Sequence, residues 1–521
     1  MTNLVTDVAD AVADHADETA IGFRGQQWTY EEFWAQAGQF AQALADAGVE
    51  PGDRVGLYLP NVPQYVIAFF GTLRAGGIVV PMNPQYKSRE IEHLLGDSGA
   101  KAVIALADLV PFVTEVQGET DVETVVSVGG DAEGATEFGA FLADEQLDVV
   151  DREDDDVAVQ PYTSGTTGQP KGVLLTHHNL AWDAREANAI MEDGVREDDK
   201  FLGVLPLFHI YGMTVTMMAT LFEGGSYWPL PEWDAAEAAD LIESERLTVV
   251  HGVPAMYNDL INQPDADDFD FSSVRFANSG GSSLPIEVMR QFEDTFDVAL
   301  YEGYGLTETS PVTHANSPEA RRPGSIGKPL NGVDSKIVDG EFNTVAKVEQ
   351  GPVDEDEVNL DDITGEVVVS GPNVMKGYYN LPEANEGVFT EEDGKRWFHT
   401  GDVGYWDEDG YFYVVDREKH MIITGGYNVY PREVEELLFE HEAIADAAVV
   451  GIPDERRGET IKAFVVPAAG YEPGVDITEE EIKEYALTNL AEYKHPRQVE
   501  FTDELPRTTT GKVQKFELRD E

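Results

Sequence analysis

Short apolar runs alternate with helical stretches along this chain, and this alternation constrains its fold more than any other feature. Three such runs lie at 55–60, 75–83 and 101–106, with helical stretches between them. Two more, at 273–281 and 299–308, pass from an apolar strand directly into glycines. Alternation of buried strands with helices is typical of α/β layers built on mainly parallel sheets. In such sheets, ligands bind beside the carboxyl ends of the strands.

The length and the changing pattern predict more than one domain. With 521 residues, the chain is too long for a single hydrophobic core. After residue 365 the pattern changes to short β stretches separated by turn signals, with helices expected at 431–441 and 480–491. We therefore predict a large N-terminal domain of layered α/β subdomains, followed by a small α+β C-terminal domain of about one hundred residues.

The charge of the chain is extreme. It has 99 acidic residues against 35 basic ones, a net charge of −64. The acidic residues are spread along the whole length, so the chain repels itself in dilute buffer. In molar salt the Debye length falls to roughly 3 Å and this repulsion is screened. The charge predicts a halophilic protein, and the lack of a basic patch argues against nucleic-acid binding.

Cysteine is absent from the sequence. This excludes disulfides, thiolate zinc sites and a cysteine nucleophile, so any thiol chemistry must use a thiol from a substrate. No apolar run approaches the ~18 residues of a transmembrane segment. The first residues lack the pattern of a signal peptide, which predicts a cytoplasmic protein. The sequence leaves the oligomeric state open, a homodimer being one option.

The stretch 162–172 (YTSGTTGQPKG) is the strongest candidate for binding a ligand. It holds four Ser or Thr hydroxyls, three glycines and one lysine. Glycines let backbone amides approach an anion closely, and the hydroxyls and the lysine add donors and charge. The composition also fits a plain surface loop. It is not a Walker A loop, because Pro170 stands before the lysine. The chemistry suits a polyphosphate such as ATP.

The order of residues in this stretch resembles the signature loop of the adenylate-forming superfamily. This superfamily includes acyl-CoA synthetases, aryl-CoA ligases, luciferases and the adenylation domains of peptide synthetases. Further segments resemble its motifs in the same order, at 301–309, 400–402, 416–419 and 506–512. The resemblance covers nearly the whole chain, and it implies ATP, Mg²⁺ and coenzyme A as cofactor and cosubstrates.

The resemblance also implies roles for the residues in these motifs. Tyr304 stacks on adenine, Thr307 contacts the α-phosphate, and Glu308 holds Mg²⁺. An aromatic face suits a purine, and a hard oxygen ligand suits magnesium. Asp402 accepts the ribose hydroxyls, with Arg417 beside it. The catalytic residues expected on this basis are Lys512, Glu308 and Thr307.

A wider set is expected to contact the nucleotide and coenzyme A. It consists of Thr163, Ser164, Gly165, Thr166, Thr167, Lys171, Gly280, Gly281, Glu302, Gly303, Tyr304, Thr307, Asp402, Arg417, Lys419, Gly425 and Gly426. In coenzyme-A-forming members, the segment matching 205–212 borders the acyl group. His209 and Tyr211 are therefore candidates for the substrate pocket, although each also fits a packed core position.

The resemblance further implies a hinge. Lys419 matches the hinge position of the family, where the backbone turns between two domain orientations. We accordingly predict an AMP-binding N-terminal domain at 1–417 and a mobile C-terminal domain at 418–521. Gly425 and Gly426 would let the pantetheine arm pass close to the backbone. Some relatives carry a lysine at the position of Gly425, so side-chain contacts to coenzyme A are not expected there.

Together these motifs predict an AMP-forming acid–thiol ligase that uses medium- or long-chain fatty acids. The carboxylate would attack the α-phosphate of ATP and release pyrophosphate, and a thiol would then displace AMP. An aryl- or hydroxycinnamate-type CoA ligase is a close alternative, because it shares similar motifs. An adenylation enzyme that acylates a carrier protein is a third. A noncatalytic acidic interaction protein disagrees with the intact Glu308, Asp402, Arg417 and Lys512.

Overall fold

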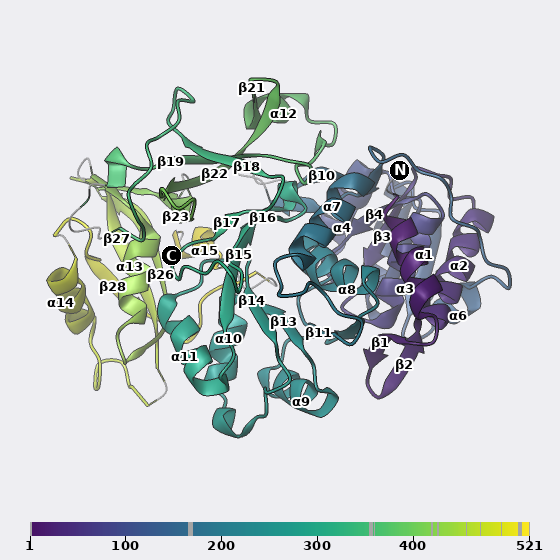
Figure 1. Ribbon diagram of the computed structural model, residues 1–521, viewed down its shortest axis with the longest axis horizontal. Helices are drawn as coiled ribbons and strands as arrows, with labels where there is room; N and C mark the ends of the chain where they lie inside the picture. The colour runs from purple at the N-terminus through teal and green to yellow at the C-terminus, as the bar shows by residue number, and fades with distance from the viewer. Residues whose placement is uncertain are drawn as a thin grey trace.

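The structure is a computed structural model, and Figure 1 shows the course of the chain. It describes residues 3–164, 170–353, 358, 360–417, 420–424, 427–454, 456–468, 470–490, 492–508 and 513–519. The predicted α/β class is confirmed. A large N-terminal part carries two mainly parallel sheets, and a smaller C-terminal part has its own sheet and core. In Figure 1 this smaller part, drawn in yellow-green, lies at the opposite end of the molecule from the N-terminus.

The first sheet holds the strands that lead to the predicted ligand-binding glycines. All neighbours from β1 to β15 are parallel, whereas β2, β16 and β17 are antiparallel additions at the two edges. In spatial order the strands are β17 (Lys328–Pro329), β16 (Val312–Ala315), β15 (Leu300–Gly305), β14 (Phe276–Ser279), β13 (Val249–Gly252), β11 (Lys200–Gly203), β12 (Ser226–Pro229), β1 (Thr19–Phe23) and β2 (Gln26–Thr29).

The second sheet contains the runs predicted at 55–60, 75–83 and 101–106, and these three strands are neighbours. Its strands from β8 to β7 are parallel, and β10 is antiparallel to the strands beside it. In spatial order they are β20 (Gly377–Tyr378), β10 (Pro170–Thr176), β8 (Val157–Val159), β4 (Ile78–Pro81), β3 (Arg54–Tyr58), β5 (Ala102–Leu106), β6 (Thr124–Val128) and β7 (Thr136–Glu137), with β9 (Tyr162–Ser164) also paired to β10.

Helices cover these sheets. They are α1 (Leu4–His15), α2 (Tyr30–Asp46), α3 (Pro63–Arg74), α4 (Ser88–Ser98), α5 (Val110–Val116), α6 (Phe138–Phe141), α7 (His177–Asn188), α8 (Ala219–Phe222), α9 (Ala235–Glu245), α10 (Pro254–Ile261), α11 (Ile286–Phe296) and α12 (Pro382–Val388), with a π-helix η3 (Gly212–Met218) and a 3₁₀ turn η5 (Thr307–Thr309). Among the described residues, no helix combines the length and apolar content needed to cross a membrane.

Helices α2 and α3 show how the sequence determines local structure. The side chain of Thr29 caps α2 and forms a capping box with Glu32, so the helix begins at Tyr30. Helix α3 is apolar on nearly every side and is buried in the main core. A Cβ on Gly71 would lie 2.7 Å from the Phe40 ring, so this glycine allows α2 and α3 to pack closely.

The third sheet departs from the expectation of mainly parallel sheets, because all its strands are antiparallel. Two of its connections, at 393–394 and 407–411, are short turns, and antiparallel pairing is the arrangement that such short connections allow. Its strands are β18 (Asp334–Val338), β19 (Gly365–Ser370), β22 (Lys395–Trp406), β21 (Phe389–Glu392) and β23 (Phe412–Arg417).

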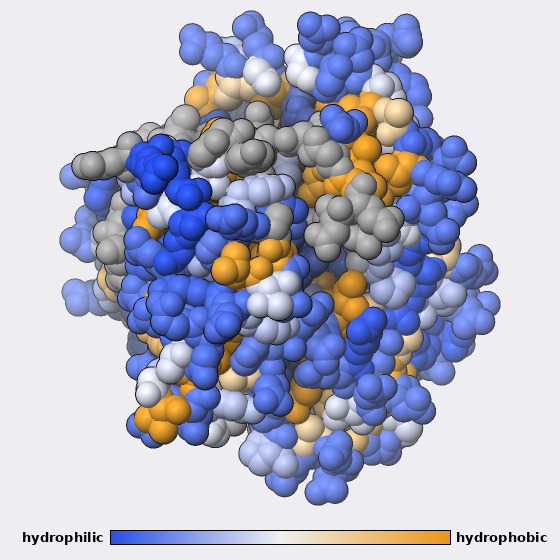
Figure 2. Space-filling model, turned by 90° about the vertical axis from the view of Figure 1, so that its left-hand side faces the viewer, coloured by the Kyte–Doolittle hydropathy of each residue, from blue (hydrophilic) through white to orange (hydrophobic). Residues whose placement is uncertain are grey.

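The C-terminal part contains the two helices predicted there, α13 (Pro431–Phe439) and α14 (Glu479–Asn489), followed by α15 (Lys515–Arg519). Its strands are β25 (Tyr427–Val429), β24 (Ile422–Thr424), β27 (Gly458–Pro467), β26 (Ile444–Asp454) and β28 (Gln498–Phe501). They enclose a separate apolar core, as an independent domain requires. Figure 2 shows this end of the molecule, whose surface is largely hydrophilic with scattered apolar patches.

Candidate active site

The carboxyl ends of β13, β14 and β15 meet at one edge of the first sheet. Gly252 pairs with Ser279, and Ser279 with Glu302, so β13 and β14 end in register beside Glu302, and β15 continues to Gly305. Gly280 and Gly281 follow Ser279 directly, and Gly281 has φ +80°, which glycine adopts without strain. The buried Ser279 hydroxyl has no hydrogen-bond partner in the described part of the chain. This edge therefore offers close backbone approach and a polar group that a ligand could satisfy.

Tyr304, Asp402 and Arg417 form a polar cluster at this edge. The Tyr304 hydroxyl donates to Asp402 Oδ2 at 2.5 Å, and Arg417 Nε lies 2.9 Å from Asp402 Oδ1. Asp402 and Arg417 face each other across β22 and β23. The Asp402 side chain is 3% exposed, whereas that of Arg417 is 39% exposed. The Asp402 carboxylate raises the pKa of Arg417, so the guanidinium stays charged.

A second cluster joins Glu308 to the loop predicted to bind phosphate. The Tyr378 hydroxyl donates to Glu308 Oε1 at 2.8 Å, and the Lys171 ammonium lies 5.2 Å from the centroid of the same ring. The backbone of Met375 donates to the Glu308 carbonyl at 2.8 Å, which ties the turn η5 to the segment before β20. Glu308 and Lys171 therefore border one region, with Tyr378 between them.

Glu302 is a buried carboxyl group within β15, opposite Ser279 at the end of β14. Its Oε1 accepts the Leu284 amide at 3.2 Å, which holds the segment after Gly281 against the strand. Burial raises the pKa of Glu302 to about 7, although the nearby guanidinium of Arg432 and this hydrogen bond act against the shift. Arg432 belongs to α13 and also donates to the Val414 carbonyl at 2.6 Å. The C-terminal part thus packs beside the predicted nucleotide site.

Tyr211, a candidate for the substrate pocket, lies at this edge within a polar cluster. Asn278 Nδ2 donates to its hydroxyl at 2.8 Å, and His251 Nδ1 lies 3.3 Å from the same oxygen. A Cβ on Gly280 would lie 3.0 Å from the Tyr211 ring, so the ring rests against that glycine. His209 Nδ1 accepts the backbone amide of Tyr211 at 3.2 Å. Tyr211 therefore adjoins Gly280, and His209 contacts the backbone of Tyr211.

The structure thus brings most of the described candidates to one edge of the first sheet. Gly303 lies in β15, Thr307 opens the turn η5, and the backbone of Thr163 pairs with that of Lys171. The remaining candidates, Gly165, Thr166, Thr167, Lys419, Gly425, Gly426 and Lys512, lie outside the described residues, as does the side chain of Ser164. Sequence reasoning missed Tyr378, because nothing in its neighbourhood signals that it meets Glu308, 70 residues away.

The fold and this site together define an enzyme of the adenylate-forming class. Residues 8–379 match the model of the AMP-binding enzyme family, and residues 433–512 match that of the AMP-binding enzyme C-terminal domain. The chain belongs to the AMP-binding enzyme family.

Three relatives illustrate the similarity. The chain is 38% identical to the long-chain-fatty-acid–CoA ligase of Bacillus subtilis (strain 168), over 99% of this chain and 93% of the relative. It is 37% identical to a feruloyl-CoA synthase of Amycolatopsis sp, over 96% of this chain and 95% of the relative. The crystal structure of the anthranilate CoA ligase AuaEII in complex with anthranoyl-AMP matches with a TM-score of 0.91 and 28% identity, covering 99% of this chain and 96% of that one.

The residues present fit ATP and Mg²⁺, which this family uses together with coenzyme A. In the described part of the chain, no three His, Cys, Asp or Glu side chains gather as a metal site. Magnesium does not need such a cluster, because it is commonly held by one or two carboxylates together with water and substrate phosphates. Glu308, beside Lys171, meets that requirement.

Proposed function

We propose that the chain is an ATP-dependent acyl-CoA synthetase that activates a medium- or long-chain fatty acid. The observation that carries this proposal is the Asp402 carboxylate. It is buried, the Tyr304 hydroxyl donates to one of its oxygens, and Arg417 Nε lies 2.9 Å from the other. A carboxylate has about four acceptor sites. Acceptor capacity therefore remains for the two ribose hydroxyls of a nucleotide stacked on Tyr304.

The first reaction joins the carboxylate oxygen of the acid to the α-phosphorus of ATP and breaks the bond to the β-phosphate oxygen. Pyrophosphate leaves, so the main task of the protein is to orient the two substrates and stabilise charge on the phosphoryl oxygens. We assign Lys171 and Thr163 to the departing phosphates and Thr307 to the α-phosphate. When bound at Glu308, Mg²⁺ supplies positive charge against those oxygens. We assign Lys512 to the bridge between the two reacting groups.

The second reaction joins the thiol sulfur of coenzyme A to the acyl carbon and releases AMP. No protein nucleophile is required, which agrees with the absence of cysteine. We propose that the part at 418–521 turns about Lys419 between the two reactions. This turn would remove Lys512 and bring Gly425 and Gly426 beside the thiol.

A panel of acids tests this proposal. Octanoate, palmitate and ferulate are each incubated with ATP, Mg²⁺ and coenzyme A in molar KCl, and AMP, pyrophosphate and thioester are measured. We expect the three products in equal amounts, with the highest kcat/KM for a fatty acid. Release of ADP and phosphate, or no product with any acid, would contradict an acyl-CoA synthetase. Thioester formation only with a carrier protein would favour the third alternative.

One observation favours the aryl-CoA ligase as second candidate. The Tyr211 hydroxyl, His251 and Asn278 form a buried polar cluster on the acyl side. Such a cluster suits a ring with a polar substituent better than an alkyl chain, which offers no hydrogen bonds. A higher kcat/KM for ferulate than for palmitate would make this candidate the function.

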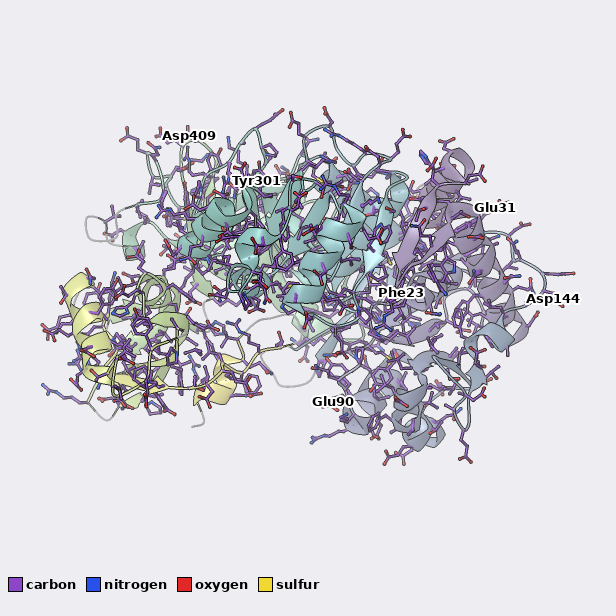
Figure 3. All side chains as sticks on the ribbon, turned by 90° about the horizontal axis from the view of Figure 1, so that it is seen from below. Phe23, Glu31, Glu90, Asp144, Tyr301 and Asp409 are labelled. Atoms are coloured by element: carbon purple, nitrogen blue, oxygen red, sulfur yellow. The ribbon has the colours of Figure 1, made fainter. Side chains whose placement is uncertain are left out.

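We further propose that the protein works in molar salt. Glu31, Glu90, Asp144 and Asp409, labelled in Figure 3, lie at the surface and are exposed. Raising KCl from 0.1 M to about 3 M should increase the melting temperature, because screening reduces self-repulsion. A melting temperature that falls with salt would contradict this proposal. The predicted cytoplasmic location stays a prediction.

A further inference from the structure

One face of α4 contacts both strands of the hairpin that carries Thr163 and Lys171. His93 Nε2 lies 3.1 Å from the carbonyl oxygen of Pro170, in β10. The Tyr162 hydroxyl, in β9, donates to Asp97 Oδ2 at 2.7 Å. Residues four positions apart lie on the same face of a helix. Helix α4 therefore reaches each strand of the hairpin with one side chain.

The chemistry of the contact at Pro170 defines what His93 must do. A carbonyl oxygen only accepts hydrogen bonds, so Nε2 must carry the proton and donate it. The His93 ring also meets the Tyr162 ring edge to face, with centroids 6.3 Å apart and planes at 75°. His93 thus bridges the two strands by a hydrogen bond on one side and an aromatic contact on the other.

The Tyr162 hydroxyl is held from a second direction. Gln160 Nε2 donates to it at 2.9 Å, and Arg54 Nε donates to Gln160 Oε1 at 3.3 Å. Burial and the neighbouring Asp97 raise the pKa of Tyr162, so the phenol keeps its proton and remains a donor. A Cβ on Gly172 would lie 2.8 Å from Gln160 Nε2, which shows how closely the hairpin packs on this support.

The hairpin needs support of this kind because it is short. Its ladder consists of three residue pairs, Pro170 with Ser164, Lys171 with Thr163 and Gly172 with Tyr162. A two-stranded ribbon is marginally stable by itself in water. The later part of β10 pairs with β20 at Val173 and Leu174 and with β8 at Leu175 and Thr176. Toward Pro170, α4 supplies the side-chain contacts described above.

We propose that His93 and Asp97 are positioning residues for ATP: they hold the hairpin where Lys171 and Thr163 meet the β- and γ-phosphates. This inference rests on the proposed function, because it takes the hairpin to be the phosphate site. Neither residue touches substrate, so each acts through the place of the hairpin. Their removal should weaken the use of ATP and leave the use of the acid and of coenzyme A unchanged.

Paired substitutions at His93 test the proposal. His93→Phe keeps the ring and removes the donor, whereas His93→Gln keeps an N–H at a similar reach. ATP–pyrophosphate exchange in molar KCl gives KM for ATP and for the acid, and the full reaction gives KM for coenzyme A. We expect His93→Phe to raise KM for ATP about 3- to 10-fold, the range of one lost hydrogen bond. We expect His93→Gln to bring KM for ATP most of the way back to that of the unchanged protein.

Asp97 provides a second pair. Asp97→Ala removes the acceptor for the Tyr162 hydroxyl and should also raise KM for ATP, whereas Asp97→Asn keeps an acceptor and should raise it less. His178→Phe is the matched control, because His178 is an exposed histidine at the start of α7. It should leave all three KM values unchanged.

Two results would overturn the proposal: an unchanged KM for ATP in His93→Phe while Lys171→Ala raises it, or an equal rise of all three KM values. Calorimetric titration with ATP separates this inference from the proposed function. If the protein shows no acid-dependent turnover but His93→Phe still binds ATP several-fold more weakly, the ligase function fails and the positioning role stands. Equal binding of ATP by His93→Phe and the unchanged protein refutes the positioning role.

Discussion

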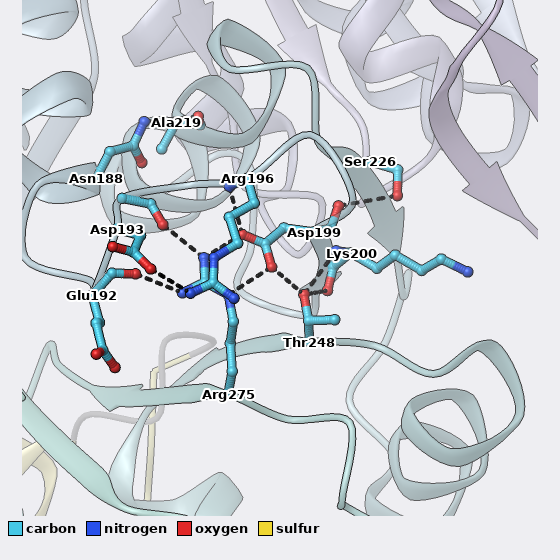
Figure 4. A network of polar contacts seen from close by, with 11 residues as sticks. Asn188, Glu192, Asp193, Arg196, Asp199, Lys200, Ala219, Ser226, Thr248 and Arg275 are labelled. Carbon is cyan, nitrogen blue, oxygen red and sulfur yellow. Dashed lines mark hydrogen bonds and ion pairs between the residues drawn. The ribbon is translucent and has the colours of Figure 1, made fainter.

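Two Arg–Asp pairs can be compared, Asp199–Arg275 at the amino ends of the parallel strands of the first sheet and Asp402–Arg417 beside their carboxyl ends. They differ in how many hydrogen bonds their side chains make. Asp199 and Arg275 stand just before β11 and β14, at the amino ends of the parallel strands (Figure 4). Arg275 Nε donates to Asp199 Oδ1 at 2.8 Å, and its Nη2 to Oδ2. The other Arg275 donors reach the carbonyls of Glu192 and Gly194, at 3.1 Å and 2.7 Å.

Asp199 is equally saturated. It accepts from the Arg196 amide at 2.8 Å and from the Thr248 hydroxyl at 2.7 Å, in addition to Arg275. By contrast, among the described residues the Asp402 carboxylate accepts one hydrogen bond from a side chain, that of Tyr304, and forms an ion pair with Arg417. The saturated pair connects strands and has no capacity for a ligand. The half-saturated pair keeps the acceptors and donors that a nucleotide requires.

Removal of the guanidinium at the amino end should give the largest effect on stability. Arg275→Leu leaves the Asp199 carboxylate, whose side chain is 1% exposed, without its main partner. Loss of one member of a buried pair costs about 3–5 kcal/mol. We expect that decrease in the free energy of unfolding by denaturant, with kcat per folded molecule unchanged. Arg246→Ala, which breaks the half-exposed pair with Asp270, is the control and should cost below about 1 kcal/mol.

At the carboxyl end we expect a large effect on activity and a smaller effect on stability. Asp402→Ala should reduce kcat/KM for ATP about 100-fold, a loss of ~2.7 kcal/mol, because two hydrogen bonds to a charged group are lost. Its effect on unfolding should be smaller than that of Arg275→Leu, since Arg417 is partly exposed and can be solvated. Asp409→Ala, in the turn after β22, is the control. If Asp402→Ala lost stability but kept its activity, the two Arg–Asp pairs would have the same role, and the distinction between them would be wrong.

The two ends should also respond to pH with opposite signs. Burial alone would raise the pKa of Asp199, but hydrogen bonds from Arg275, Arg196 and Thr248 lower it below its usual value. Its contribution to stability is therefore present above the unfolded pKa and lost as the pH falls through the folded one. The pKa of Glu302 is raised from 4.5 to about 7. Its contribution is present below pH 4.5 and is lost as the pH rises through about 7.

Glu302→Gln isolates the second effect, because its amide oxygen can still accept the Leu284 amide. Between pH 5 and pH 8, the unchanged protein should lose about 2 kcal/mol of unfolding free energy relative to this variant. Unfolding by denaturant at several pH values in constant salt measures the difference. Parallel curves for the two proteins would show that Glu302 is ionised in the folded protein throughout this range.

Much of this architecture could be predicted from residue patterns, because apolar periodicity and glycine turns act locally. The strands β3, β4 and β5 and the helices α13 and α14 were predicted in this way. Tyr304, Asp402 and Arg417 were identified from motifs, and the structure brings them together although Tyr304 and Asp402 are 98 residues apart. The contacts of Tyr378 and of α4 were not predictable, because no local pattern records which distant side chains a packed fold places in contact.

The smallest effect should come from Tyr378→Phe, which tests whether the Tyr378 hydroxyl orients Glu308 at the carboxyl end. The Tyr378 hydroxyl donates to Glu308 Oε1, and such a hydrogen bond orients a carboxylate that holds a metal ion. Its loss should raise the Mg²⁺ concentration needed for half-maximal pyrophosphate exchange about 3- to 10-fold, or ~1 kcal/mol. Tyr379→Phe removes the same hydroxyl from the next residue, whose ring packs under Arg54, and should change nothing. If both variants required the same Mg²⁺ concentration, the Tyr378 hydroxyl would have only a packing role. Asp402 would then be the one carboxylate of the two to which this comparison assigns ligand binding.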